Sequence, residues 1–297
     1  MDRYARDDFD LPPTLNSGIA HVLLTKSAHH AWWKHPRLRP GWQPDDDRGF
    51  DLGTAAHAVL LEGRELFAVE FPDYRSKMAQ AVRDEAKAAG KLPVLADQAS
   101  DVAAMVAVAR TMLGNSPDLA DLAPLKAEQT CVFQQDGTWL RCRPDWITED
   151  HRAILSYKTT RASAEPNAFL RIILGSGYHV QAAFELAGLQ AVIGRNVAQS
   201  YIWLVQECEE PFACSLLGMV PEFVAFAQQA MRKAVSVWRE CLARDRWPAY
   251  PANICYLDLP PWAQAKFMEQ HGYEPQPVHD DGTRPIEEVM FEKGIMP

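Results

Sequence analysis

The segment RPDWITEDHRAILSYKTT, residues 143–160, contains the side chains of this sequence that are best suited to catalysis or metal binding. Asp145 follows a proline, and Ser156 and Lys158 stand two positions apart farther along the segment. Residues two apart in a β-strand project from the same face, so Ser156 and Lys158 should point together while Tyr157 faces the other side. We expect Asp145, near the end of a neighbouring strand, to approach the same point.

Carboxylates and a lysine in this arrangement are typical of phosphodiester hydrolysis. Carboxylate oxygens are hard ligands for Mg²⁺, and bound Mg²⁺ polarises a phosphate and lowers the pKa of water. A nearby lysine orients that water and stabilises the charge that develops on the phosphoryl oxygens. The segment looks like such a site with one carboxylate missing, at the position of Ser156. Taken alone, the pattern also fits a solvated hairpin with a surface lysine.

Helical patterns surround this segment. Apolar spacing predicts a helix at about 14–33 after a cap at Asn16 or Ser17, and a second in FDLGTAAHAVLLEG that ends at Gly63. A loop rich in Pro and Asp separates them at 35–49. Further helices are expected at about 75–89, 97–113, 165–193, 221–243 and 261–270.

Strand patterns dominate the middle of the chain. EQTCVFQQDGTWLRCRPDWI contains two β-rich runs joined at Gln135-Asp136-Gly137, and Asp-Gly is a strong hairpin signal. RAILSYKTT then predicts a third strand of an antiparallel meander, and residues 199–207 predict another. Helices on both sides of a small mixed sheet indicate an α/β fold. We expect one domain over 1–297, with its core at about 50–210, a helical segment at 14–48, and a C-terminal helix and arm at 220–297.

Composition sets wide limits on function. The 297 residues are 47% hydrophobic and 23% charged, as is ordinary for a soluble globular protein. The formal net charge of −9 argues mildly against a protein that coats nucleic acid, but it leaves nucleic-acid enzymes open. Six cysteines without a CxxC pair argue against a zinc ribbon. Because no apolar run reaches about 18 residues and the N-terminus lacks a signal core, we expect a cytoplasmic protein without membrane contact.

Five landmarks follow one another in the order of a known nuclease family: LGTAAHAVLLEG, AEQTCVF, RCRPDWI, ILSYKTT and YHVQAAFE. On these, the sequence resembles the RecE (exonuclease VIII) branch of the PD-(D/E)xK nucleases, which are related more distantly to lambda exonuclease and the RecB nuclease domain. The resemblance extends from about Leu15 to Gly194, and a weaker similarity follows in WPAYP at 247–251. It implies a restriction-endonuclease-like core.

The resemblance also implies roles for individual residues. Asp145 matches the first acidic metal ligand, and Lys158 matches the catalytic lysine. His57 of GTAAH would bind the metal or lie beside it. Glu128 would support a second metal or the attacking water, and the main-chain carbonyl of Tyr157 would complete the metal shell.

Two positions depart from the family pattern. Gln181 matches the glutamine of a helical Q-x-x-x-Y motif beside the DNA backbone, but Glu185 replaces the tyrosine of that motif. Ser156 replaces an acidic metal ligand, and a neutral hydroxyl binds Mg²⁺ poorly. We therefore expect a chain that keeps the fold and the binding of DNA ends but is impaired in cleavage. The sequence fits a natural serine and a deliberate substitution equally well.

The function that the resemblance implies is a Mg²⁺-dependent 5′→3′ exodeoxyribonuclease, with Mn²⁺ as an alternative cation. It would act on linear double-stranded DNA ends and leave 3′ single-stranded tails for a RecT-like annealing protein. A ring-shaped homo-oligomer would thread the duplex. Candidate DNA contacts are Lys34, Arg37, Arg39, Arg75, Lys77, Arg143 and Arg161.

Other functions remain open at this point. The main alternative is a non-catalytic DNA-end-binding or recombination-scaffold protein with a nuclease fold, and Ser156 is the residue that discriminates the two. Iron–sulfur relatives of these nucleases need a cysteine before the core, and no cysteine precedes Cys131. A different fold with a coincidental hairpin is the third alternative.

Overall fold

The computed structural model describes residues 11–43, 52–122, 124–194 and 199–272. The backbone forms two compact units, Met1–Tyr250 and Pro251–Pro297. Within the described part of the second unit lies one helix, α9 (Pro261–His271). The predicted arm beyond 272 and the end of the loop at 35–49 lie outside the described residues. The single domain over 1–297 stays a prediction.

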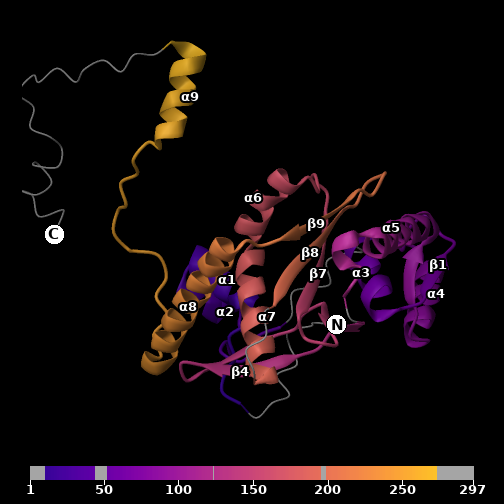
Figure 1. Ribbon diagram of the computed structural model, residues 1–297, viewed down its shortest axis with the longest axis horizontal. Helices are drawn as coiled ribbons and strands as arrows, with labels where there is room; N and C mark the ends of the chain where they lie inside the picture. Colours follow the sequence, from indigo (N-terminus) through magenta and orange to yellow (C-terminus); the bar gives the residue numbers. More distant parts are fainter. Residues whose placement is uncertain (1–10, 44–51, 123, 195–198, 273–297) are drawn as a thin grey trace, which may run out of the picture. The chain divides into compact units, whose positions relative to one another are not determined.

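A mixed five-stranded sheet forms the centre of the first unit, in the order β3-β6-β7-β8-β9. Its strands β7, β8 and β9 lie side by side in Figure 1. Strands β7 and β8 are parallel, and the other neighbouring pairs are antiparallel. The strands are β3 (Leu125–Ala127), β6 (Trp146–Thr148), β7 (Ala153–Thr160), β8 (Ser200–Glu207) and β9 (Cys214–Gly218). This arrangement confirms the predicted small mixed sheet.

One face of the sheet packs against helices α3 (Leu52–Glu62) and α5 (Ala96–Asn115). Leu155 and Tyr157 of β7 and Leu204 of β8 contribute buried side chains to this core. Because side chains alternate along a strand, residues 154, 156 and 158 belong to the opposite face. The predicted separation of Tyr157 from Ser156 and Lys158 is confirmed.

The opposite face packs against helices α6 (Pro166–Ser176) and α7 (Tyr178–Ile193). Ile154, Tyr201 and Trp203 are buried there, with apolar side chains of α7. The predicted helix at 165–193 is thus two helices, and Gly177 between them adopts a φ of 75°, which favours glycine.

Helix α7 also forms part of a second core on its far side. This core contains the hairpin of β4 (Cys131–Gln135) and β5 (Thr138–Cys142), and the helices α1 (Ser17–Thr25) and α8 (Pro221–Arg244). A helix that is covered on both sides is buried around most of its circumference, which explains the apolar sequence of α7. Any polar side chain that α7 turns toward the sheet is therefore removed from water.

A small parallel pair of strands lies apart from the central sheet. Strands β1 (Leu66–Val69) and β2 (Leu92–Leu95) pair in parallel on either side of α4 (Lys77–Ala88) in sequence. The sequence patterns did not predict these strands, nor β3 and β9. Each has five residues or fewer, too few for a clear alternation of apolar and polar side chains.

Two further predictions need correction. The helix expected at 14–33 is broken into α1, which Asn16 caps as predicted, and α2 (Ala28–Lys34). Ser27 ends the first part because its hydroxyl accepts a hydrogen bond from the His30 amide and caps α2. The predicted meander is also wrong, because β5 and β6 belong to different sheets. Pro144 lies between them and has no amide hydrogen for a strand ladder.

No helix in the described ranges is both long enough and apolar enough to cross a membrane.

Gly53 sets the distance between α3 and β7. A Cβ at this position would lie 2.0 Å from Thr159 Oγ1 and 2.9 Å from Thr159 Cβ. Rotation of the threonine hydroxyl relieves only the first contact. We expect Gly53→Ala to destabilise the fold by about 1–3 kcal/mol, because α3 must move away from the strand.

Urea denaturation of Gly53→Ala and Gly114→Ala measures this effect. Gly114 lies in α5 with no atom within 4 Å of its added Cβ. Gly114→Ala should therefore gain about 0.5–1 kcal/mol from helix propensity. Equal stability of the two variants would contradict the close approach of α3 and β7.

Candidate active site

Asp145 is the centre of the candidate site. It directly precedes β6, and its Oδ2 accepts hydrogen bonds from the Ser156 hydroxyl and the Tyr157 amide, both at 2.9 Å. Lys158 Nζ lies 3.8 Å from the same oxygen. The antiparallel pairing of β6 with β7 places these groups together. Asp145, Ser156 and Lys158 thus lie close together, as the sequence predicted.

The Asp145 carboxylate is buried, with 7% of the residue exposed. Burial alone would raise its pKa. The positive charge of Lys158 and hydrogen bonds from His57 and Ser156 outweigh that penalty and hold the pKa of Asp145 well below its usual range. Asp145 is therefore an anion at any pH near neutrality, as a metal ligand must be.

Helix α3 brings His57 to the other carboxylate oxygen. His57 Nε2 lies 3.1 Å from Asp145 Oδ1 and 3.8 Å from Glu128 Oε1. The close approach at Gly53, one turn earlier in α3, holds this helix against the sheet. The imidazole is thus placed between two carboxylates. The metal-binding role that the resemblance implies for His57 stays a prediction.

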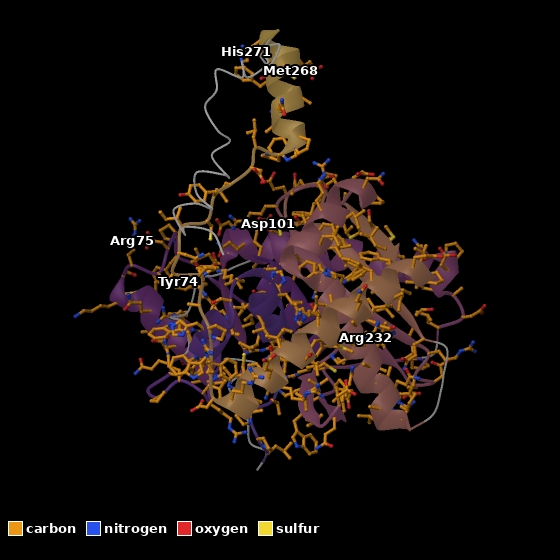
Figure 2. The ribbon with its side chains drawn as sticks, turned by 90° about the vertical axis from the view of Figure 1, so that its left-hand side faces the viewer. Tyr74, Arg75, Asp101, Arg232, Met268 and His271 are labelled. Carbon is orange, nitrogen blue, oxygen red and sulfur yellow. The ribbon has the colours of Figure 1, made fainter. Side chains whose placement is uncertain are left out.

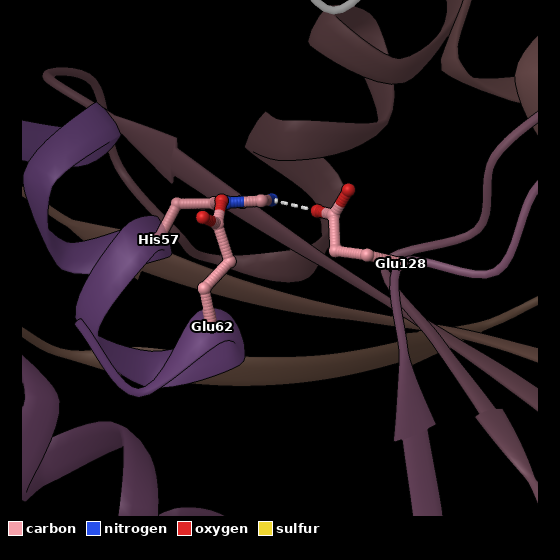
Figure 3. Close-up of side chains that lie close together, drawn as sticks. All are labelled: His57, Glu62 and Glu128. Atoms are coloured by element: carbon pink, nitrogen blue, oxygen red, sulfur yellow. Dashed lines mark ion pairs between the residues drawn. The ribbon is translucent and has the colours of Figure 1, made fainter. Parts of the chain in front are cut away.

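Glu128 follows β3 in a strained backbone conformation. Its φ is 57°, which few residues other than glycine adopt. The Glu128 amide donates to the Asp145 carbonyl at 3.0 Å, and its carboxylate forms an ion pair with Arg143. The turn directs the Glu128 side chain toward His57 (Figure 3). Strain of this kind is concentrated at functional sites.

His57, Glu62 and Glu128 form a cluster that could hold a metal ion (Figure 3). One ligand atom from each lies within 4.8 Å of the others. The carboxylate oxygens of Glu62 and Glu128 suit a divalent cation such as Mg²⁺ or Mn²⁺. No sequence pattern pointed to Glu62 beside His57, because residues five apart in a helix are rotated by roughly 140°. Glu62 reaches the cluster from the last position of α3.

Gln181 lies on α7 and has a different set of contacts. Its Nε2 donates to Glu185 Oε1 at 2.7 Å, and the Tyr201 hydroxyl donates to Glu185 Oε2 at 2.8 Å. Burial, and then the charge of Asp145, raise the pKa of Glu185 to about 7, against the lowering effects of Lys158 and these two hydrogen bonds.

Ser156 itself is fully buried. The Tyr157 main chain belongs to β7, in register with Leu204 of β8.

The basic residues predicted to contact DNA fall into separate groups. Arg143 joins the site through Glu128, and Arg161 follows β7 directly. Arg75 precedes α4, is 92% exposed in its side chain, and lies next to Tyr74 on the surface (Figure 2). Lys77 begins the same helix. The remaining group, at the end of α2 and just after it, comprises Lys34, Arg37 and Arg39.

Two of these arginines have local contacts that fit a structural role. The Arg39 guanidinium lies over the Trp33 ring, 4.5 Å from its centre, and Arg37 donates to the Leu11 carbonyl. Such contacts hold the segment after α2 in place. The DNA-contact roles stay predictions.

Comparison with known protein families bears directly on this site. The model described as a PDDEXK-like domain of unknown function, DUF3799, matches residues 24–260. The chain belongs to this family. The matched range includes Asp145, Lys158, His57 and Glu128. The PDDEXK-like assignment confirms the predicted fold class.

A solved structure with a similar fold is a presumed exonuclease from Eubacterium rectale. It is 8% identical, with a TM-score of 0.54, and the match covers 93% of this PDDEXK-like chain and 92% of that one. At this identity the likeness shows the fold alone. SSO0001 is 13% identical over 55% of this chain and 68% of its own, with a TM-score of 0.27, too low to support an argument. No curated protein matches the sequence.

Proposed function

We propose that this PDDEXK-like protein is a divalent-cation-dependent nuclease, and specifically a 5′→3′ exodeoxyribonuclease that acts on linear double-stranded DNA ends. The observation that carries the proposal is the buried, ionised Asp145, which has Lys158 on one side and His57 on the other. An ionised carboxylate in this position can bind a divalent cation. The ammonium group of Lys158 beside it can contact a phosphate oxygen.

The donor set fits Mg²⁺, with Mn²⁺ as an alternative. Asp145 and His57 would bind the cation, together with the Tyr157 carbonyl, while Glu128 and Glu62 extend the site toward α3. Bound there, the cation supplies Lewis-acid polarisation of the phosphate and a lowered pKa of water.

The residues of the chain supply orientation and charge. Lys158 Nζ lies 3.8 Å from Asp145 Oδ2 and 5.1 Å from the centre of the Tyr178 ring, so two contacts position its ammonium group. From there it would orient the attacking water and stabilise the negative charge on the phosphoryl oxygens. Arg143, paired with Glu128, would contact the DNA backbone beside the site.

The resemblance to the RecE branch supports the finer part of the proposal. On that basis the products would be 3′ single-stranded tails for a RecT-like annealing protein, and a ring-shaped homo-oligomer would thread the duplex. The Eubacterium rectale protein of similar fold is itself presumed to be an exonuclease. The basic groups around α2 and α4 would guide the duplex toward the site.

Ser156 supports a second candidate, a DNA-end-binding protein that has lost cleavage. Its hydroxyl donates to Asp145 Oδ2 and places no charge in the site. Under this second candidate, Ser156→Asp should raise the rate of Mg²⁺-dependent degradation of linear duplex DNA about tenfold or more, because a charged ligand is restored. Equal, robust activity of the two proteins would contradict impairment by Ser156.

Linear and circular DNA test the proposed function. The substrates are a 5′-phosphorylated linear duplex and a closed circle of the same sequence, each with and without Mg²⁺. We expect degradation of the linear duplex alone, and only with Mg²⁺. Degradation of the circle would rule out the exonuclease, and binding of ends without degradation would favour the second candidate.

A further inference from the structure

Glu185 is a carboxylate that the proposed site does not yet use. Only 2% of the residue is exposed, on a helix whose neighbouring side chains are apolar. Ala182 and Leu189, on the same side of α7, pack against the central sheet. Glu185 therefore points toward the sheet face that also carries Ser156 and Lys158.

Two contacts link helix α7 to the strands of the site. Near its start, the Tyr178 ring lies 5.1 Å from Lys158 Nζ. Two turns later, Glu185 accepts a hydrogen bond from Tyr201, which is in register with Ile154 on the same face. The Tyr201 hydroxyl also interacts with the Ser156 side chain. Tyr201 thus joins Glu185 to the position where the carboxylate is missing.

The electrostatics agree with this placement. After burial, the strongest influence on the pKa of Glu185 is the negative charge of Asp145, and Lys158 acts in the opposite direction. The same Lys158 is the main group that stabilises the Asp145 anion. The charges of Asp145 and Lys158 therefore both act on the Glu185 carboxylate.

A buried carboxylate close to a second one is costly for the fold. Burial and like charge both disfavour the ionised form, and two neutral hydrogen bonds offset only part of this cost. A cation between the two groups would remove the repulsion and favour ionisation of both.

We propose that Glu185 supplies, from helix α7, the carboxylate that position 156 lacks, and that Glu185 and Asp145 together hold the divalent cation. This inference rests on the proposed function, since it concerns the same site. It also links the two departures from the family pattern: the sequence loses a carboxylate at Ser156 and gains one at Glu185.

Calorimetric titration with Mn²⁺ tests the inference without a measurement of cleavage. The full-length wild-type chain is compared with Glu185→Gln and with the double variant Ser156→Asp/Glu185→Gln. We expect Glu185→Gln to weaken Mn²⁺ binding by about tenfold or more, and the double variant to recover most of that loss. Glu240→Gln, on the exposed side of α8, is the matched control and should bind Mn²⁺ as the wild type does.

The outcomes separate this inference from the function on which it rests. If the wild type binds no Mn²⁺, the proposed function fails, and the inference fails with it. If the wild type binds Mn²⁺ and Glu185→Gln binds equally well, the inference alone is overturned. Weakened binding that Ser156→Asp does not restore, in a variant with an unchanged unfolding midpoint, also overturns it.

A second variant keeps the inference testable if Glu185→Gln does not fold. Glu185→Asp keeps the charge and withdraws the carboxylate by one methylene. Weaker Mn²⁺ binding by this variant, with its unfolding midpoint retained, supports the inference, and unchanged binding overturns it.

Discussion

Asp145→Asn is expected to reduce DNA cleavage about 10³-fold, a loss of roughly 4 kcal/mol in transition-state stabilisation. Asparagine is nearly isosteric and keeps one carbonyl oxygen that can accept from the Tyr157 amide. It removes the negative charge that faces Lys158 at 3.8 Å and His57 at 3.1 Å. Loss of that charge also removes the main hard ligand for the cation. Initial rates on a 5′-phosphorylated linear duplex at saturating Mg²⁺ measure the effect.

Asp136→Asn is the matched control for this prediction. Asp136 lies in the hairpin turn between β4 and β5 with a φ of 50°, a conformation that asparagine also adopts. This variant should cleave DNA as the wild type does. Circular dichroism and the unfolding midpoint must show that Asp145→Asn is folded. Similar rates for the two folded variants would show that the chemistry does not depend on Asp145.

Folding stability should fall between about pH 4.5 and pH 7 because of Glu185. The pKa of Glu185 is raised from 4.5 to about 7 in the fold, first by burial and then by Asp145. The folded protein therefore binds more protons than the unfolded chain over this range, so rising pH favours unfolding. The contribution of this one group amounts to about 3 kcal/mol between the two limits. Below about pH 4.5 the Glu185 carboxyl is protonated in both the folded and the unfolded chain, so it causes no change of folding stability with pH there.

Glu185→Gln isolates this contribution, because glutamine does not titrate. Urea denaturation at pH 5 and pH 8, in the absence of divalent cations, gives the free energy of unfolding of the wild type and the variant. At each pH, the free energy of unfolding of the wild type is subtracted from that of the variant. This difference should be more positive at pH 8 than at pH 5, by an amount approaching about 3 kcal/mol. The control Glu240→Gln should show no such change, since Glu240 is exposed. The same difference for Glu185→Gln at both pH values would refute the raised pKa.

Local rules were enough to predict much of the fold and the centre of the site. Apolar spacing located most helices, and the side-chain cap at Asn16 begins α1 as expected. Alternation along β7 separated Tyr157 from Ser156 and Lys158, and the short turn after β6 brought Asp145 to them. These features depend on residues that are close in sequence, so a single sequence contains the information for them.

The remaining features depend on contacts between distant segments. Glu62 and His57 of α3 form a cluster with Glu128 only because α3 ends beside the residue that follows β3, far along the chain. Glu185 meets Tyr201 because α7 packs along β8. The carboxylate at Glu185 was visible in the sequence as a departure from the Q-x-x-x-Y motif of the nucleases that the sequence resembles. Its relation to Ser156 depends on the parallel register of β7 and β8, which no local pattern specifies.

The most direct test of the proposed cation-dependent nuclease is a Mg²⁺ titration of DNA degradation by the wild-type protein. A 5′-phosphorylated linear duplex is incubated with increasing Mg²⁺, with EDTA, and with Asp145→Asn in parallel. We predict degradation that rises with Mg²⁺, stops with EDTA, and is lost in the variant. Degradation that persists in EDTA, or no degradation at any Mg²⁺ concentration, would contradict a cation-dependent nuclease centred on Asp145.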